Sequence, residues 1–368
     1  SQALSLPPDA YTSDDLLTLE RERIFRREWI CVGRTDELSA PGDYFTTEID
    51  NAPIIVVHGS DGNIRAMANV CRHRLTVLTN GSGNTEYFSC PYHGWTYDTE
   101  GQLITAPRMP QPPAFTKDDC RLPLVRVELW NGFIYVNLDE NAAPLKPRLV
   151  DLTELFANYH VEDMRTVWHK QELWDTNWKV LAENFLEVYH VAVTHPDTLY
   201  PLGSHKLVEM LPAAPGYHFY RQQLEDTVEP IPLDPEIAIE NPDLNEFEQR
   251  NVYVGGVFPS HVFSVAWDWV FWLSLQPHGS GQVKIDVGVL GPVTLPVNQP
   301  EYPNFPYPPL VDAINAEDRV RLEAVQRGAK SGLGAQGRLH QHEEPIWGFI
   351  RYLVHQLCGD AVGAHKSV

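Results

Sequence analysis

The stretch CRHRLTVLTNGSGNTEYFSCPYHGW, residues 71–95, contains two cysteines and two histidines in two short pairs. The first pair is Cys71-x-His73, and after sixteen residues comes the second, Cys90-x-x-His93. Cysteine and histidine are both metal ligands, so each pair is a chelating hook. Together they could hold zinc in a Cys2His2 tetrahedron, or a two-iron cluster in which two imidazoles replace thiolates on one iron.

The arrangement of the hooks bears on this choice. Zinc fingers usually separate their cysteines by two to four residues and place both histidines on a helix. Here each hook mixes one cysteine with one histidine, among residues typical of strands and turns. The spacing therefore favours the two-iron cluster over zinc, and over an accidental grouping of buried cysteines with surface histidines.

Composition excludes several classes of protein. The 368 residues suggest two domains, and 43% hydrophobic residues are enough for packed cores without any run long enough to cross a bilayer. The net charge of -21 disfavours nucleic acid and anionic membranes as partners. Five scattered cysteines do not resemble a disulfide framework. The first residues lack the features of a secretion signal, so we expect a cytoplasmic protein.

The pattern of apolar residues predicts an α+β fold with two parts. A helix is expected in 13–29, capped by Ser13, and short β-branched and aromatic runs then predict a small antiparallel β domain at 42–140. Residues 1–41 and 141–368 are expected to form a larger α+β domain, with an antiparallel sheet covered by helices. The proline-rich run 296–309 is expected to be a loop.

One apolar segment, 260–277, is expected to be a strand in the larger domain. Side chains alternate between the two faces of a strand. Alternation puts one set on a core-facing side: Phe263, Val265, Trp267, Trp269, Phe271 and Leu273. The smaller residues of the opposite side are candidates to line a pocket, with aromatic rings nearby to cage a cation: Ser264, Ala266 and Asp268.

A second group of metal-binding residue types lies in NWKVLAENFLEVYHVAVTHP, residues 177–196. Glu187 and His190 are three apart, so a helix would present them on one face, and His195 would follow at or just past its end. Two neutral imidazoles and a carboxylate form the facial triad of non-haem Fe(II) oxygenases. From these residues alone the carboxylate stays open, because Glu183, Glu187 and several C-terminal acids compete.

Cys71-x-His73 together with Cys90-Pro-Tyr-His-Gly-Trp resembles the Rieske [2Fe-2S] motif of the ring-hydroxylating oxygenase α subunits. The resemblance implies that Cys71 and Cys90 hold one iron, that His73 and His93 hold the other, and that Trp95 covers the cluster. One residue departs from the pattern. Leu75 stands where many members of the family have glycine, which can alter the loop backbone but not a ligand.

The family also places a third iron ligand on a distant C-terminal helix. The segment NAEDRVRLEAVQRG, residues 315–328, is similar to that helix and puts Asp318 in the ligand position. The resemblance thus implies a mononuclear Fe(II) held by His190, His195 and Asp318. Asn184, which alone would be taken as a capping or surface amide, is assigned to the same site because of the two histidines beside it.

Glu187 occupies the place of the family's bridging acid, which is usually an aspartate. The resemblance implies that this carboxylate connects a Rieske histidine to an iron-binding histidine across neighbouring subunits, commonly in a trimer, so that His93 would face the partner subunit's Glu187. Accepting N–H bonds from two imidazoles would orient both. A glutamate at this place resembles the oxygenases that act on betaines and other quaternary ammonium compounds.

The implied activity is oxygenation of a small organic substrate with O2. Electrons would come from a separate flavin and iron-sulfur reductase that uses NAD(P)H, since the only match to a dinucleotide fingerprint, GLGAQG at 332–337, follows a helix where the motif needs a strand. Hydroxylation or N-demethylation of a quaternary ammonium compound is favoured. Oxygenation of an aromatic ring or aromatic acid is the alternative, and a non-catalytic electron carrier is a remote one.

Overall fold

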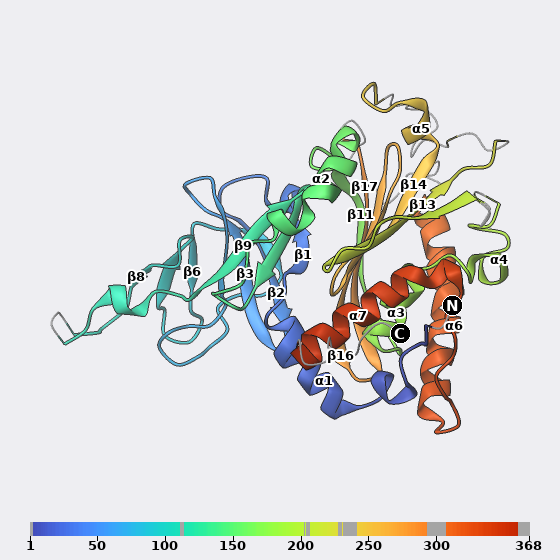
Figure 1. The fold of residues 1–368 in the computed structure, drawn as a ribbon. Coiled ribbons are helices and arrows are strands. Elements are labelled where there is room, and N and C mark those ends of the chain that lie inside the picture. The colour runs from blue at the N-terminus through green and yellow to red at the C-terminus, as the bar shows by residue number, and fades with distance from the viewer. Residues whose placement is uncertain are drawn as a thin grey trace. The chain divides into compact units, whose positions relative to one another are not determined.

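The computed structural model of the chain is shown in Figure 1. It describes residues 3–110, 114–201, 203, 207–226, 230, 241–292 and 307–359, with the side chains of 307–309 left undescribed. Most of the expected proline-rich loop therefore lies outside the described residues. The chain divides into two compact units, Phe25–Lys146 on the one hand and Ser1–Ile24 with Pro147–Val368 on the other. The predicted β domain, 42–140, lies inside the first unit.

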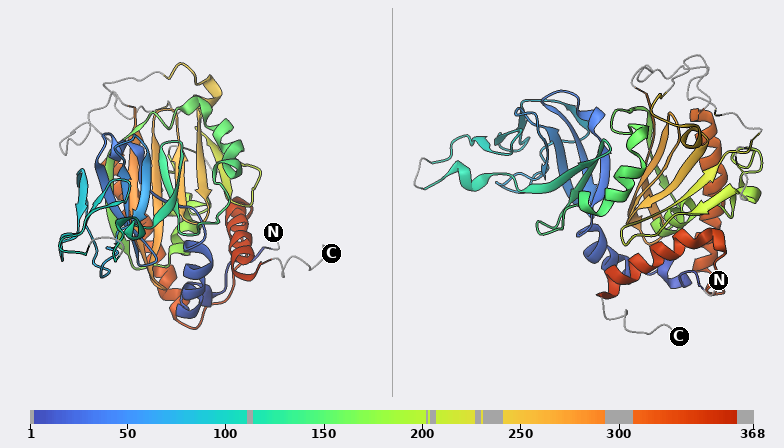
Figure 2. Two further views of the ribbon diagram at one scale, coloured as in Figure 1. Left: turned by 90° about the vertical axis from the view of Figure 1, so that its left-hand side faces the viewer. Right: turned by 45° about the horizontal axis from the view of Figure 1, so that its top comes forward.

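The first unit contains a seven-stranded antiparallel sheet and a smaller three-stranded one. In the larger sheet the order is β1-β10-β9-β4-β3-β2-β5. Its strands are β1 (Ile30–Arg34), β2 (Asp43–Ile49), β3 (Ala52–His58), β4 (Ile64–Ala68), β5 (Ser82–Asn84), β9 (Leu124–Trp130) and β10 (Phe133–Asn137). The smaller sheet contains β6 (Tyr87–Ser89), β7 (Thr96–Asp98) and β8 (Leu103–Thr105), and it extends beyond the larger sheet within this unit (Figure 2).

Tight turns connect several of these strands. The Asp61–Gly62 pair lies between β3 and β4, and Gly62 takes a positive φ of 85° that favours glycine. The two cysteine-histidine hooks are also connections, the first from β4 to β5 and the second from β6 to β7. One buried cluster contains the cysteines of both hooks, Cys71 and Cys90, together with Ile55, Met67 and Trp95. This core positions both hooks.

The second unit is built on another seven-stranded antiparallel sheet. The strand order is β11-β17-β16-β15-β14-β13-β12. Its strands are β11 (Arg165–Trp174), β12 (Val208–Met210), β13 (Tyr217–Gln223), β14 (Asn251–Val257), β15 (His261–Val265), β16 (Val270–Gly279) and β17 (Gln282–Gly291). The α+β class with antiparallel sheets, predicted from the sequence, is confirmed.

Helices cover this second sheet (Figure 1). The helices of this unit are α1 (Asp14–Glu20), α2 (Val150–Leu155), α3 (Trp178–Phe185), α4 (Val191–Thr194), α5 (Glu246–Gln249), α6 (Tyr307–Lys330) and α7 (Glu344–Cys358). Helix α3 packs across β14 to β17, α7 contacts β13 and α6 contacts β11. No helix among the described residues combines the length and the apolar character that crossing a bilayer requires.

The N-terminal helix begins as predicted and is tied to α3. The Ser13 side chain accepts a hydrogen bond of 3.1 Å from the backbone N–H of Leu16 and so caps α1. At the end of α1 the buried Glu20 carboxylate accepts hydrogen bonds from Trp178 Nε1 at 2.9 Å and Lys179 Nζ at 2.6 Å. Burial is tolerated because this charge pair also has its hydrogen bonds satisfied.

The prediction of one strand at 260–277 is wrong, because the segment is a hairpin of β15 and β16. Val265 pairs with Val270, and the N–H of Ala266 donates to the carbonyl of Trp269 at 3.0 Å, which closes a short turn. Side chains alternate between the two faces in each strand, but the turn breaks the continuity of this alternation from β15 to β16. Phe263 therefore pairs with Trp272 while Phe271 pairs with Ser264. Of the six residues expected on one face, Phe263 and Val265 lie on one face of the hairpin, Phe271 and Leu273 on the other, and Trp267 and Trp269 in the turn.

Candidate metal centres

The two hooks of the first unit have the same backbone geometry. In the first, the N–H of Leu75 donates to the carbonyl of Cys71 at 3.0 Å; in the second, the N–H of Gly94 donates to that of Cys90 at 3.0 Å. Each cysteine N–H also donates to the carbonyl five residues further along the chain. Leu75 and Gly94 both take positive φ values, 62° and 70°. Leu75 thus keeps the conformation that the family's glycine favours, without displacing the hook.

The four candidate cluster ligands are separated by type. Cys71 and Cys90 are buried and their thiols interact with each other. The rings of His73 and His93 are exposed and lie 4.7 Å apart, edge to face. A Rieske cluster needs this division, with two thiolates on one iron and two imidazoles on the other. Trp95 is buried and stacks on His73 at 4.8 Å, so it lies beside the imidazole pair.

Local hydrogen bonds favour a thiolate at Cys90. Burial acts to raise the pKa of Cys90, but hydrogen bonds from the backbone at Tyr92 and His93 and from the side chains of Cys71 and Thr76 together outweigh it, and the pKa of the thiol is lowered. Tyr97 lies beside the sulfur of the other cysteine, Cys71. Its hydroxyl accepts from the N–H of Arg72 at 3.0 Å and lies 3.4 Å from Sγ of Cys71, so its own proton can point to that sulfur. Tyr97 was not among the residues predicted from the sequence.

The second candidate centre lies where α3 ends. Helix α3 stops at Phe185, so Glu187 and His190 lie in the turn before α4 and not on one helix, as the spacing suggested. His190 is the residue before α4 and His195 the residue after it. The four residues of α4 therefore separate the two histidines by one short helical turn. This turn presents both rings to α6, which carries Asp318.

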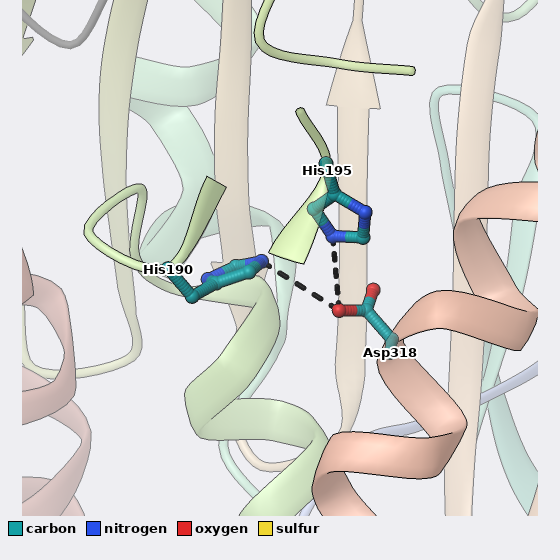
Figure 3. A group of neighbouring side chains, drawn as sticks. All are labelled: His190, His195 and Asp318. Carbon is teal, nitrogen blue, oxygen red and sulfur yellow. Dashed lines mark hydrogen bonds and ion pairs between the residues drawn. The ribbon is translucent and has the colours of Figure 1, made fainter. Parts of the chain in front are cut away.

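The three residues converge (Figure 3). Oδ1 of Asp318 lies 3.0 Å from Nε2 of His195 and 3.6 Å from Nε2 of His190. One atom from each side chain lies within 4.8 Å of the other two, which is the spacing of ligands around a single ion. Two imidazoles and a carboxylate on one side of an ion leave its other positions open for small molecules. The donor set fits a mononuclear iron.

Each histidine has a carboxylate at its other ring nitrogen. Oε1 of Glu187 lies 2.5 Å from Nδ1 of His190, and its Oε2 accepts from the backbone N–H of His190 at 3.1 Å. Oε2 of Glu317 lies 2.7 Å from Nδ1 of His195. Such partners fix which nitrogen carries the proton and leave Nε2 free to bind a metal. Glu317 lies next to Asp318 in the sequence, but the sequence analysis did not single it out.

These charges set the protonation of the buried His195. Burial acts to lower the pKa of this imidazole, but the hydrogen bonds and charges of Asp318 and Glu317 raise it above its ordinary value. A bound cation would instead take the place of the proton between Nε2 and Asp318.

A cavity of about 260 Å³ opens beside the three converging residues, all of which line it. Its wall is largely apolar and includes six aromatic side chains: Trp174, Phe185, Tyr220, Trp267, Trp269 and Phe271. Asn184, Gln222, Ser264 and Asn315 supply polar groups. Of the pocket candidates from the sequence, Ser264 lines the cavity, whereas Trp267, Trp269 and Phe271, which were expected in the core, lie in its wall because of the hairpin.

Comparison with protein families agrees with this division of the chain. Residues 28–124 match the Rieske [2Fe-2S] domain, and residues 156–359 match the catalytic domain of the ring-hydroxylating α subunit. The chain belongs to the ring-hydroxylating oxygenase α-subunit family. The cofactors of this family, a Rieske cluster and a mononuclear iron, are those that the two groups of side chains fit.

Several members of this family resemble the chain. The carnitine monooxygenase oxygenase subunit of Acinetobacter pittii is 34% identical over 197 residues, 53% of each chain. The benzene 1,2-dioxygenase α subunit of Pseudomonas putida is 37% identical over 205 residues, 52% of this chain and 44% of that one. Each match spans about half the length of the curated relative or less. A solved quaternary ammonium Rieske monooxygenase has the same fold, with a TM-score of 0.82 and 24% identity over 96% of this chain and 95% of that one.

Proposed function

We propose that the chain is the oxygenase component of a Rieske monooxygenase that oxidises a quaternary ammonium compound. The observation that carries this proposal is the convergence of His190, His195 and Asp318 at the wall of an apolar cavity, with a carboxylate on Nδ1 of each histidine. Together with a Rieske domain in the same chain, this arrangement supports a reaction that joins single-electron transfer to dioxygen chemistry at carbon.

In this proposal each residue has a defined role. Cys71 and Cys90 would hold one iron of the cluster, and His73 and His93 the other. His190, His195 and Asp318 would hold the mononuclear iron, which supplies dioxygen activation when bound. Glu187 orients His190 and would accept a hydrogen bond from the Rieske histidine of a neighbouring subunit. Asn184 lines the cavity close to these ligands and is proposed to contact substrate or water.

The proposed substrate class has two supports. The first is similarity to an enzyme named for carnitine, with Glu187 at the place of the bridging acid. The second is the cavity wall, because aromatic rings bind cations through their faces, and Trp267 and Trp269 lie edge to face at 6.3 Å.

The reaction would oxidise an N-methyl or adjacent C–H group. Insertion of one oxygen atom into an N-methyl C–H bond gives a hydroxymethyl group, which leaves as formaldehyde when its C–N bond breaks. The second oxygen atom leaves as water, with two electrons and two protons. A separate NAD(P)H reductase is proposed to supply the electrons, and a homotrimer is proposed to bring the clusters and irons of neighbouring subunits together.

Oxygenation of an aromatic ring is the second candidate. It is favoured by the similarity to the benzene 1,2-dioxygenase α subunit and by the largely apolar cavity wall. An aromatic ring and a trimethylammonium group are similar in width, and both pack well against tryptophan. The two candidates share all the proposed metal ligands, so the substrate must be determined by assay.

The deciding experiment measures dioxygen uptake by iron-replete protein with a matching reductase and NADH. One panel contains betaines and simple trimethylammonium compounds, and the other contains benzene derivatives and aromatic acids. Uptake matched by formaldehyde, or by a hydroxylated amine, supports the proposal. Uptake matched by a hydroxylated aromatic product, with the whole ammonium panel inert, would replace it with the second candidate.

A further inference from the structure

His195 lies between two carboxylates that are neighbours in the sequence. Asp318 approaches Nε2 of the ring at 3.0 Å, and Glu317 approaches Nδ1 at 2.7 Å. Both acids belong to α6, and the His195 side chain is fully buried. One helix therefore supplies a partner for each nitrogen of the same imidazole.

The two contacts have different consequences for a bound metal. Nε2 of His195 and Nε2 of His190 both face Oδ1 of Asp318, so these are the atoms that can share an ion. A neutral imidazole that binds through Nε2 carries its proton on Nδ1. That proton is donated to Glu317, and this hydrogen bond fixes both the tautomer and the plane of the ring.

Glu317 is itself held in place. The hydroxyl of Thr198 donates to Oε2 of Glu317 at 2.7 Å, the same oxygen that contacts Nδ1 of His195. The Glu317 side chain is 31% exposed, so water can compete for the carboxylate. The hydrogen bond from Thr198 restricts that competition and keeps the oxygen directed at the ring.

We propose that Glu317 is a positioning residue that retains the mononuclear metal by fixing His195, and that Thr198 holds Glu317 for this purpose. The inference rests on the proposed iron site. The two carboxylates at the Nδ1 positions then have different roles. Glu187, on His190, lies on the proposed path of the electron, whereas Glu317, on His195, acts on metal affinity and ring orientation.

The test is a titration of the full chain with Co(II) after the mononuclear site has been emptied and the Rieske cluster retained. The visible spectrum of the cluster verifies that each variant is folded. Glu317→Ala is expected to bind Co(II) about 10- to 100-fold more weakly than the unmodified chain, as for other partners of metal-binding histidines. Glu317→Gln is expected to lose less Co(II) affinity than Glu317→Ala, because its amide oxygen still accepts a hydrogen bond from the Nδ1 proton. The Co(II) affinity of Thr198→Val should lie between those of the unmodified chain and Glu317→Ala.

A spectroscopic readout separates positioning from a general loss of stability. With the His195 ring free to turn, the ligand-field bands of bound Co(II) should shift in Glu317→Ala and return towards their original positions in Glu317→Gln. Glu323→Ala is the matched control, because this glutamate is on the same helix and pairs with Arg319 at 2.8 Å. It should leave both affinity and bands unchanged.

The outcomes separate the inference from the site on which it rests. Equal Co(II) affinity and equal bands for Glu317→Ala and Glu323→Ala would overturn the role of Glu317. The proposed iron site would fail in a different way, if Asp318→Ala bound Co(II) as tightly as the unmodified chain. Loss of affinity in Asp318→Ala without any loss in Glu317→Ala would thus remove the inference and leave the site.

Discussion

Oε1 of Glu187 lies 2.5 Å from Nδ1 of His190, and the Glu187 side chain is largely buried. The same carboxylate is anchored by backbone N–H groups of Tyr189 and His190. It can therefore hold the imidazole in one orientation while its remaining surface stays available to a second donor. This relationship connects a proposed metal ligand to the proposed entry point of electrons.

Replacing Glu187 tests that connection. Glu187→Gln keeps the size of the side chain but removes its charge, so we expect the rate of cluster oxidation by O2 and substrate to fall by about 10- to 100-fold. The measurement is a single turnover of the chemically reduced protein, followed through the visible spectrum of the cluster. Glu323→Gln serves as the control, and equal rates for the two variants would exclude a role for Glu187 in electron delivery.

The hydroxyl of Tyr97 should set the reduction potential of the cluster. It lies 3.4 Å from Sγ of Cys71, and hydrogen bonds to cluster sulfurs raise the potential because they stabilise the more negative reduced state. Tyr97→Phe is expected to lower the potential by an amount on the order of tens of millivolts, measured by redox titration. Tyr87→Phe, in exposed β6, should have no effect. An unchanged potential in Tyr97→Phe would mean that the hydroxyl proton does not point to the sulfur.

The two hooks offer a matched pair of backbone tests. Leu75 is strained by its φ of 62° and is 78% exposed, so Leu75→Gly should raise the free energy of unfolding by about 1 kcal/mol. Gly94 has the same conformation, and a Cβ there would have room, since its nearest neighbour is Cγ of Pro107 at 3.6 Å. Gly94→Ala should therefore lower stability by about 1 kcal/mol through strain alone. Denaturant unfolding that gave both changes the same sign would refute this explanation.

Glu183 should make stability depend on pH. Burial raises the pKa of this acid from 4.5 to about 7, although the Tyr11 hydroxyl and Lys179 act to lower it. A raised pKa favours the protonated acid in the folded state, so its stabilising contribution is complete below pH 4.5 and is lost as the pH rises to about 7. The loss amounts to about 3 kcal/mol.

The variant Glu183→Gln isolates this contribution. An amide does not ionise, so the variant should lack this decline in the free energy of unfolding and should be the more stable protein at pH 8, by up to about 3 kcal/mol. Glu154→Gln, at an exposed position of α2, should follow the pH dependence of the unmodified chain. Parallel curves for Glu183→Gln and Glu154→Gln would show that Glu183 ionises normally.

Most of the proposed metal ligands could be singled out from the sequence because short spacing constrains them locally. Cys71-x-His73 and Cys90-x-x-His93 each fit within one tight loop, and α4 is so short that His190 and His195 must be neighbours. Asp318 is far away in the sequence, and only family resemblance indicated it. Asp318 lies on α6, and packing of α6 against α4 also brings Glu317 to His195. The only sign of this contact in the sequence was that Glu317 is adjacent to Asp318.

The cavity was less predictable, because its wall depends on tertiary structure. A four-residue turn at 266–269 reverses the chain, and apolar alternation does not distinguish a hairpin of two apolar strands from one long strand. The prediction therefore assigned Trp267 and Trp269 to the core. The early end of α3 was missed for a related reason, since the apolar pattern continues from α3 through α4 across the turn that contains Glu187.

The most direct test of the proposed centres is an iron count on the full chain, combined with the visible spectrum of the cluster. The unmodified chain should contain about three iron atoms, two in the cluster and one at the mononuclear site. His195→Ala and Asp318→Ala should each lose one iron and keep the Rieske spectrum unchanged, and both should lose dioxygen uptake. Three irons and undiminished uptake in either variant would contradict the assignment of His190, His195 and Asp318 as the metal site.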